Sequence, residues 1–228
     1  LSLRVMLRNQ FDSVYLINDS SGDKAVKLNY TDILKQGGIS ILGFFQDRIV
    51  ILIISLSVSA SFTSKYGFIF QILTIASFTS NIFYNSQYNN LVMFLRTNPV
   101  RFRRLFFKTI VIQVVIILFL SNLAYGFVHF FGDYFQFPVL DLYDLWFGAV
   151  FFIAINFLLI VASMLISIND YSYLYGLVLS TIILFLGLSF IPFDDVYELF
   201  AIMLFAQVLF SIWYYPYRLY NKLILLHE

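Results

Sequence analysis

Residue types that perform enzyme chemistry are scarce in this sequence. It contains no cysteine, which excludes disulfides, thiolate metal sites and iron–sulfur ligation within the chain. The two histidines, His129 and His227, lie near the end of an apolar stretch and near the last residue, where each fits an ordinary interfacial residue better than a metal ligand. No glycine-rich phosphate loop and no paired-histidine motif is present. We therefore expect no cofactor and no active site in this chain.

Ionisable side chains within apolar stretches would mark an ion pathway, because burying a charge in hydrocarbon costs several kcal/mol. They are almost absent, and the polar groups left at depth are Gln113, Asn122 and Asn156. Such amides usually form interhelical hydrogen bonds worth about 0.6 to 1 kcal/mol each. The sequence therefore favours a helical scaffold that functions within an assembly over a self-contained pump or ion transporter.

The elements that must position these residues are long apolar helices. Of the 228 residues, 61% are hydrophobic and 12% are charged, and the mean hydropathy is +0.85, whereas a soluble domain has about 25% charged residues. At about 20 residues per crossing, the chain has room for five to seven membrane-spanning helices. Its net charge of +1 excludes a nucleic-acid binder driven by bulk charge. We expect an all-α, polytopic transmembrane protein.

The apolar stretches divide the chain into segments. The first stretch includes Asp47 and Arg48 near its start, so it either spans the membrane or forms an interfacial helix. The prediction is about six spans, with a surface arm at 1–40, a transmembrane domain at 41–215 and a short inside tail at 216–228. The six stretches are residues 41–62, 66–83, 110–131, 145–168, 171–191 and 196–215.

The distribution of charge predicts the orientation, since lysine and arginine close to a span resist translocation. The basic residues are Arg96, Arg101, Arg103, Arg104 and Lys108 between the second and third stretches, and Arg218 and Lys222 after the sixth. The acidic residues fall in the alternate loops: Asp133, Asp141, Asp144, Asp194, Asp195 and Glu198. We expect the basic segments, and with six spans both termini, to face the cytoplasm or matrix.

The inside loop has a distinctive sequence. Residues 84–90 are polar, residues 91–95 are apolar, and Asn98-Pro99 precedes the basic cluster. Proline disfavours helix at the residue before it and is well suited to the first turn of a new helix. A sharp turn is therefore predicted here. The arginines that follow would lie at head-group level, where they either bind acidic phospholipid or serve only as an orientation signal.

Composition also bears on location. Phe and Tyr total 44 residues while Gly numbers 10 and Pro 4, a bias towards A/T-rich codons, and the chain opens with Leu1. These features suit an organelle-encoded product with an unusual start codon, and equally a trimmed product of an AT-rich bacterium. We expect an integral protein of the mitochondrial inner membrane or, alternatively, of a bacterial plasma membrane.

The sequence contains four short motifs: the Asn-Pro turn at 97–100, Gly-Asp-Tyr-Phe at 132–135, the aromatic-x-Gly-Ala-aliphatic pattern at 146–152, and the carboxylate-led helix at 198–206. Together they resemble the chain-6 membrane subunit of respiratory complex I, NADH:ubiquinone oxidoreductase. Their order and orientation match the family, whose members have five spans. The chain departs from the family in the polar residues 84–90, about ten extra residues before Gly132, an additional N-terminal span, and Trp146 where the family has tyrosine.

That resemblance implies a role in coupling quinone reduction to proton translocation. Trp146, Gly148 and Ala149 would lie where the family's third helix forms a π-bulge. Rotation of this helix would gate a hydrated path, and neighbouring subunits would supply the ionisable groups. Asn98, Pro99, Arg101, Arg103 and Arg104 would form the matrix-side turn and a basic patch for lipid or a partner, and Glu198 would begin the last helix. The alternative for Gly148 is close helix packing.

A second resemblance is to the six-helix permease subunits of ATP-driven exporters. In these proteins a cytoplasmic segment between the second and third spans couples to an ATPase, often through Leu-x-x-Pro-Val followed by basic residues and a lysine. This chain has a similar segment at 95–100 and Lys108, six apolar stretches and an N-terminal arm, and needs no insertions. Both resemblances imply that the chain works with other subunits of a hetero-oligomeric membrane complex.

Overall fold

A computed structural model describes residues 37, 41, 50–55, 58–135 and 137–227. The predicted arm at 1–40, except for residue 37, lies outside the described residues, as do residues 42–49 and 56–57 of the first apolar stretch. Residues 50–55 are helical. Six helices follow, and the described part of the chain contains no strand, which confirms the all-α prediction. They are α3 (Ala60–Thr97), α4 (Pro99–Phe135), α5 (Leu142–Ser167), α6 (Tyr173–Phe190), α7 (Val196–Val208) and α8 (Ser211–His227).

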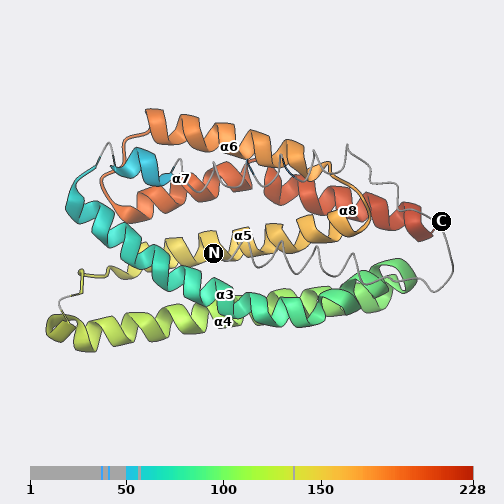
Figure 1. The fold of residues 1–228 in the computed structure, drawn as a ribbon, viewed down its shortest axis with the longest axis horizontal. Helices are drawn as coiled ribbons and strands as arrows, with labels where there is room; N and C mark the ends of the chain where they lie inside the picture. Colours follow the sequence, from blue (N-terminus) through green and yellow to red (C-terminus); the bar gives the residue numbers. More distant parts are fainter. Residues whose placement is uncertain (1–36, 38–40, 42–49, 56–57, 136, 228) are drawn as a thin grey trace. The chain divides into compact units, whose positions relative to one another are not determined.

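The helices run side by side, with α5 in the middle (Figure 1). α3 and α4 pack against one side of α5, α7 and α8 pack against the other, and α6 covers α7 and α8. Of the apolar span of α5, 61% is buried by its neighbours, against 17% for α4. Small and aliphatic side chains on α5, including Ala149, Val161 and Leu165, allow several helices to contact it. α5 therefore packs against four of the other helices, α3, α4, α7 and α8.

Five segments are long and apolar enough to cross a membrane, which is consistent with an integral membrane protein. Each is at least 18 residues long, about 27 Å as an α-helix, against a hydrocarbon core of about 30 Å. The predicted stretches at 110–131, 145–168 and 171–191 correspond to α4, α5 and α6. The five segments are Ala60–Thr97, Pro99–Gly132, Leu142–Ser167, Tyr173–Phe190 and Val196–Ile224.

The prediction of a loop at residues 84–90 was wrong, because these polar residues lie within α3. No glycine or proline occurs between Gly67 and Pro99 to interrupt the helix. Tyr84, Leu91 and Leu95 are all buried, so this part of the helix keeps an apolar side against its neighbours while the polar residues stay largely exposed. α3 therefore has 38 residues, a length of about 57 Å at 1.5 Å per residue.

The predicted turn before Pro99 is present. α3 ends at Thr97 and α4 begins at Pro99, with Asn98 between them in an extended conformation. The Asn98 N–H donates to the Phe94 carbonyl (2.9 Å), and the Asn98 side-chain oxygen accepts from the Arg101 N–H (3.0 Å). Asn98 thus caps both helices, and Pro99 occupies a first-turn position where its missing N–H costs nothing.

The apolar stretch at 196–215 is not one helix. α7 ends at Val208, and α8 begins at Ser211 and continues to His227, with Pro216 inside it. The break lets α8 take its own direction, so that the Tyr215 ring packs against Gly176 of α6, where an added Cβ would lie 2.4 Å from the ring. The Ser211 hydroxyl also donates to the Gly176 carbonyl (3.3 Å). The predicted tail at 216–228 is accordingly helical up to residue 227.

Candidate functional site

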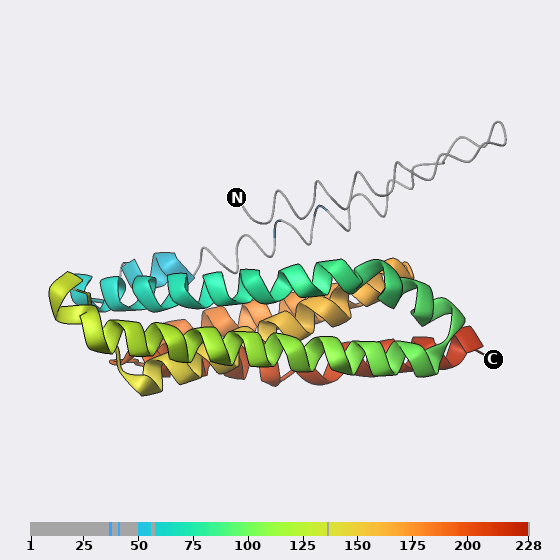
Figure 2. The same ribbon diagram turned by 90° about the horizontal axis from the view of Figure 1, so that it is seen from below.

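Charged side chains gather at opposite ends of the described helices. We call the end that contains the α3–α4 turn the basic end and the end that contains the start of α5 the acidic end. Figure 2 shows the α3–α4 turn at one end of the helices, close to the end of α8. The basic end carries Arg96, Arg101, Arg103, Arg104, Lys108, Asp170, Arg218 and Lys222. The acidic end carries Lys65, Asp141, Asp144, Asp194, Asp195 and Glu198.

The α3–α4 turn is packed on its inner side and exposed on its outer side. Leu91, Leu95 and Phe102 belong to a buried apolar cluster with residues of α5 and α8. Arg96 donates to the Ser167 carbonyl at the end of α5 (2.6 Å), where a cation is favoured by the helix dipole. The hairpin formed by α3 and α4 is therefore attached to α5 close to its turn.

The outer side of the turn is both basic and apolar. Arg101, Arg103, Arg104 and Lys108 are exposed, and no ion pair among the described residues involves them. The Arg101 guanidinium lies 6.0 Å from the centre of the Phe94 ring, at the limit of a cation–π contact. The apolar residues Met93, Val100 and Phe107 are also exposed beside these cations. Such a mixed surface is suited to binding rather than to a chemical step.

A second polar cluster at the basic end joins α5, α6 and α8. Asn169 adopts φ 57°, the left-handed conformation that ends many helices, and the chain then reaches Asp170. The buried Asp170 carboxylate pairs with Arg218 (3.1 Å) and Lys222 (3.7 Å). Burial by itself would raise the pKa of Asp170, but hydrogen bonds from Ser172 and the two cations outweigh it and lower the pKa below its usual value.

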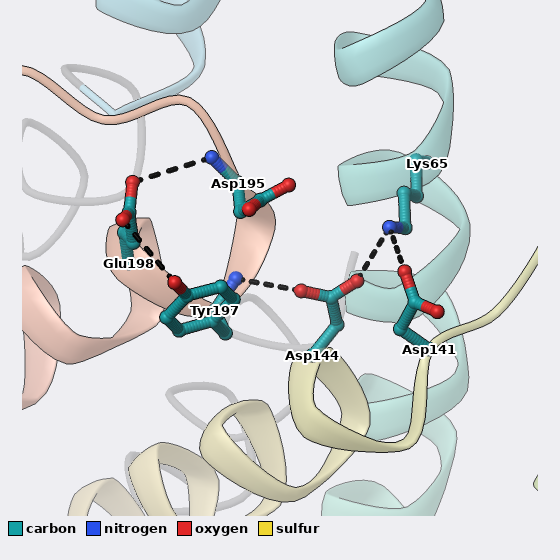
Figure 3. A network of polar contacts seen from close by, with 6 residues as sticks. All are labelled: Lys65, Asp141, Asp144, Asp195, Tyr197 and Glu198. Carbon is teal, nitrogen blue, oxygen red and sulfur yellow. Dashed lines mark hydrogen bonds and ion pairs between the residues drawn. The ribbon is translucent and has the colours of Figure 1, made fainter.

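At the acidic end, three elements meet at Asp144 (Figure 3). Lys65 of α3 pairs with Asp144 in the first turn of α5 (2.6 Å) and with Asp141 just before it (2.7 Å). The Asp144 side chain is 2% exposed and that of Asp141 is 60% exposed. The second oxygen of Asp144 accepts the backbone N–H of Tyr197 at the start of α7 (2.8 Å). One carboxylate therefore links α3, α5 and α7.

Glu198, the predicted carboxylate at the start of the last helix, has a local structural contact. Its Oε2 accepts the backbone N–H groups of Asp194 (2.8 Å) and Asp195 (3.3 Å), which would otherwise be unsatisfied at the start of α7. Its Oε1 accepts the Tyr197 hydroxyl (3.3 Å). Glu198 therefore caps α7 and does not contact Lys65 or Asp144 (Figure 3).

Amide side chains meet between α3, α4 and α5. The Asn156 oxygen accepts from Ser77 (3.1 Å) and Asn81 (2.9 Å), and Gln113 donates to the Asn81 oxygen (3.0 Å). A cavity of about 10 Å³, near the minimum size for one water molecule, borders Gln113 and Asn156. The interhelical role expected of these two amides is confirmed. Asn122 differs, because it is exposed and donates to the Leu118 carbonyl of its own helix (2.7 Å).

Gly148 lies where α5 packs closely against α3 and α7. A Cβ added to Gly148 would lie 2.4 Å from Leu73 of α3 and 3.0 Å from Phe200 of α7. Ala149 is also buried, whereas Trp146 is partly exposed. α5 is α-helical throughout Leu142–Ser167 in this structure, and Gly148 permits close helix packing. The π-bulge concerns a second conformation and stays a prediction.

Two ion pairs, one at the acidic end and one at the basic end, could not be predicted from the sequence. The links from Lys65 to Asp144 and from Asp170 to Arg218 join residues far apart in the chain, and no local spacing marks them. For the Lys65–Asp144 pair, the sequence offered one indication, which was a single lysine at the end of the molecule that carries the acidic loops.

The described residues contain no group of three or more histidine, cysteine, aspartate or glutamate side chains that could hold a metal ion. Compared with known proteins, the chain matches no family model, no curated protein and no solved structure.

Proposed function

We propose that this chain is the membrane-embedded permease subunit of an ATP-driven exporter and works with a separate ATPase. The observation that carries the proposal is the α3–α4 hairpin. Its two helices have 38 and 37 residues, about 57 and 55 Å, which is far more than the roughly 30 Å needed to cross the hydrocarbon core. The excess length ends in the capped turn at Asn98, beside exposed basic and apolar side chains.

The hairpin supplies a rigid route from the ATPase to the centre of the protein. An ATPase that contacts the turn would move Arg96 and Phe102, which are attached to the end of α5 and to the buried cluster beside it. α5 in turn is joined at its other end to α3 and α7 through Asp144. Movement at the turn would therefore alter the packing around α5, where a transported molecule would have to pass.

The proposal includes the topology expected from the sequence. The first apolar stretch, 41–62, would be a sixth span, the basic end and both termini would face the cytoplasm, and the membrane would be a bacterial plasma membrane. The segregation of basic and acidic side chains to opposite ends supports this orientation, since loops rich in lysine and arginine stay on the cytoplasmic side.

The test compares two exposed valines at opposite ends. Val100 lies on the turn, and Val139 lies in the connection before α5 at the acidic end. The full chain is purified from its native membranes, and vanadate-sensitive ATP hydrolysis is measured in the purified complex. We expect Val100→Asp to abolish co-purification of the ATPase and its activity, with normal membrane insertion, and Val139→Asp to preserve both. A wild-type complex without ATPase activity would contradict the proposal.

A second candidate is the complex I membrane subunit, in the mitochondrial inner membrane. The observation that favours it is the burial of Gly148 and Ala149 at the crossing of α5 with α3 and α7, where rotation of α5 would change the packing of all three helices. Native gel electrophoresis separates the candidates. A complex I subunit would migrate only in a particle of about a megadalton with flavin and iron–sulfur centres, and Gly148→Leu would slow proton-coupled quinone reduction without preventing assembly.

A further inference from the structure

We infer that the first turns of α4 form a binding surface for the head group of an acidic phospholipid. Arg101, Arg104 and Lys108 follow the spacing i, i+3 and i+7, which places them on one side of an α-helix. All three are exposed. The surface depends only on insertion of the chain in a membrane and not on the exporter proposal.

The three cations lie opposite the packed side of α4. The packed side is formed by Phe102, Thr109, Gln113 and Ile117, each no more than 3% exposed. In the helical projection, at 100° per residue, Arg104 lies about 175° from the centre of these residues, Lys108 about 135° and Arg101 about 115°. The cations therefore face away from the other described helices.

An apolar stripe continues from the cations along the same side of α4. Val111, Val115 and Phe119 follow Lys108 at helical spacing, and each is more than half exposed. From Lys108 to Phe119 the helix rises about 16 Å, close to the depth of one leaflet of a bilayer with a hydrocarbon core of about 30 Å. The surface thus offers cations for a phosphate and an apolar strip of the right length for an acyl chain.

No carboxylate of the described residues neutralises the charge on this surface. α4 has no acidic residue in its first turn, and none of the ion pairs among the described residues involves Arg101, Arg104 or Lys108. The nearby carboxylate of Asp170 already pairs with Arg218 and Lys222. The head group of a negatively charged lipid would neutralise the cations while its acyl chain contacts the apolar stripe, whereas a free phosphate would contact only the cations.

Arg103 provides a matched control. It is an exposed arginine next to Arg104 in the same turn of α4, but it lies about 100° around the helix from Arg104 and outside the stripe. Arg103→Gln and Arg104→Gln therefore remove the same charge at the same depth from two sides of one helix.

The test measures which lipid lies beside α4. The full chain carries a reporter substitution, Val111→Trp, with Trp146→Phe and Trp213→Phe to remove the native signal. It is reconstituted in phosphatidylcholine vesicles with and without phosphatidylglycerol, and one of the two lipids at a time carries brominated, fluorescence-quenching chains. We expect brominated phosphatidylglycerol to quench preferentially at low and moderate salt. Arg104→Gln with Lys108→Gln should lower that preference about fivefold per charge, and Arg103→Gln should leave it within twofold.

Three outcomes would overturn the inference. Equal quenching by both lipids in the wild-type chain would show that no acidic lipid is selected. An equal loss of preference in Arg103→Gln and Arg104→Gln would show a general charge effect without a defined surface. If Arg104→Gln with Lys108→Gln leaves quenching unchanged but releases a protein partner, the side chains bind protein instead of lipid.

Discussion

Asp144 shows how a single buried carboxylate holds three helices together. A buried charge is costly unless it is paired and hydrogen-bonded, and Asp144 has both an ammonium partner in Lys65 and a backbone donor at the start of α7. Asp141 shares the same lysine but is mostly exposed, so water can solvate it if the lysine is lost. The two carboxylates should therefore respond very differently to substitution.

We predict that Lys65→Met lowers the free energy of unfolding by about 3 kcal/mol, because it leaves Asp144 buried without its cation. Asp141→Asn should cost less than about 0.5 kcal/mol, since exposed ion pairs contribute little. Thermal unfolding in detergent, followed by circular dichroism, measures both variants.

The double variant Lys65→Met with Asp144→Asn is the control. Its asparagine oxygen can still accept the Tyr197 N–H, and no buried charge remains, so most of the lost stability should return. Equal stability of Lys65→Met and the wild-type protein would show that the ion pair does not contribute to folding.

The lowered pKa of Asp170 leads us to expect that the stability of the fold depends on pH. Because the pKa of the folded carboxyl is below its usual value of 3.8, the Asp170 contacts stabilise the fold above that pH, and the contribution is lost as the pH falls through the folded pKa. We expect wild type to melt at a higher temperature than Asp170→Asn at pH 7. The difference should shrink below about pH 4, and a difference that grows on acidification would contradict the assignment.

α3 differs most from its prediction, because the helix continues through residues that were expected to form a loop. Residues 84–90 are polar, and polarity between apolar stretches suggested a loop. Local polarity does not end a helix unless glycine, proline or a competing cap is present, and the buried residues Leu91 and Leu95 continue the same helical side. The turn at Asn98-Pro99 was predictable, because proline restricts the backbone of the residue before it regardless of the surroundings.

α5 depends on a small residue at its crossing with α3 and α7. We predict that Gly148→Ala lowers the melting temperature, because the new Cβ would overlap Leu73, at a cost of about 1 to 3 kcal/mol. Leu73→Ala removes a fully buried side chain and is destabilising by itself, but it should cost less in the Gly148→Ala background because the new methyl group occupies part of the space. If the destabilisation of Gly148→Ala with Leu73→Ala equals the sum of the two single effects, the two residues do not share a packing contact.

For the whole molecule, the segregation of charge predicts its orientation in the membrane. The chain contains no cysteine, so each introduced cysteine would be the single site of labelling. In intact cells, a membrane-impermeant maleimide should label Val139→Cys at the acidic end directly, and Arg103→Cys at the basic end only after permeabilisation. Ser20→Cys, in the predicted N-terminal arm, should behave as Arg103→Cys does if residues 41–62 span the membrane. The reverse pattern at Val139 and Arg103 would show that the proposed orientation is wrong.

The sequence by itself determined the class of the protein, the apolar helices and the turn at Asn98. These follow from average hydropathy, from the length of charge-free stretches and from the fixed backbone angle of proline, all of which act locally. The tertiary structure decided that α3 continues through its polar segment, that Asn156 bonds across helices while Asn122 does not, and that Lys65 pairs with a buried Asp144. Each of these depends on which helix faces which, and that is set by contacts between residues distant in the chain.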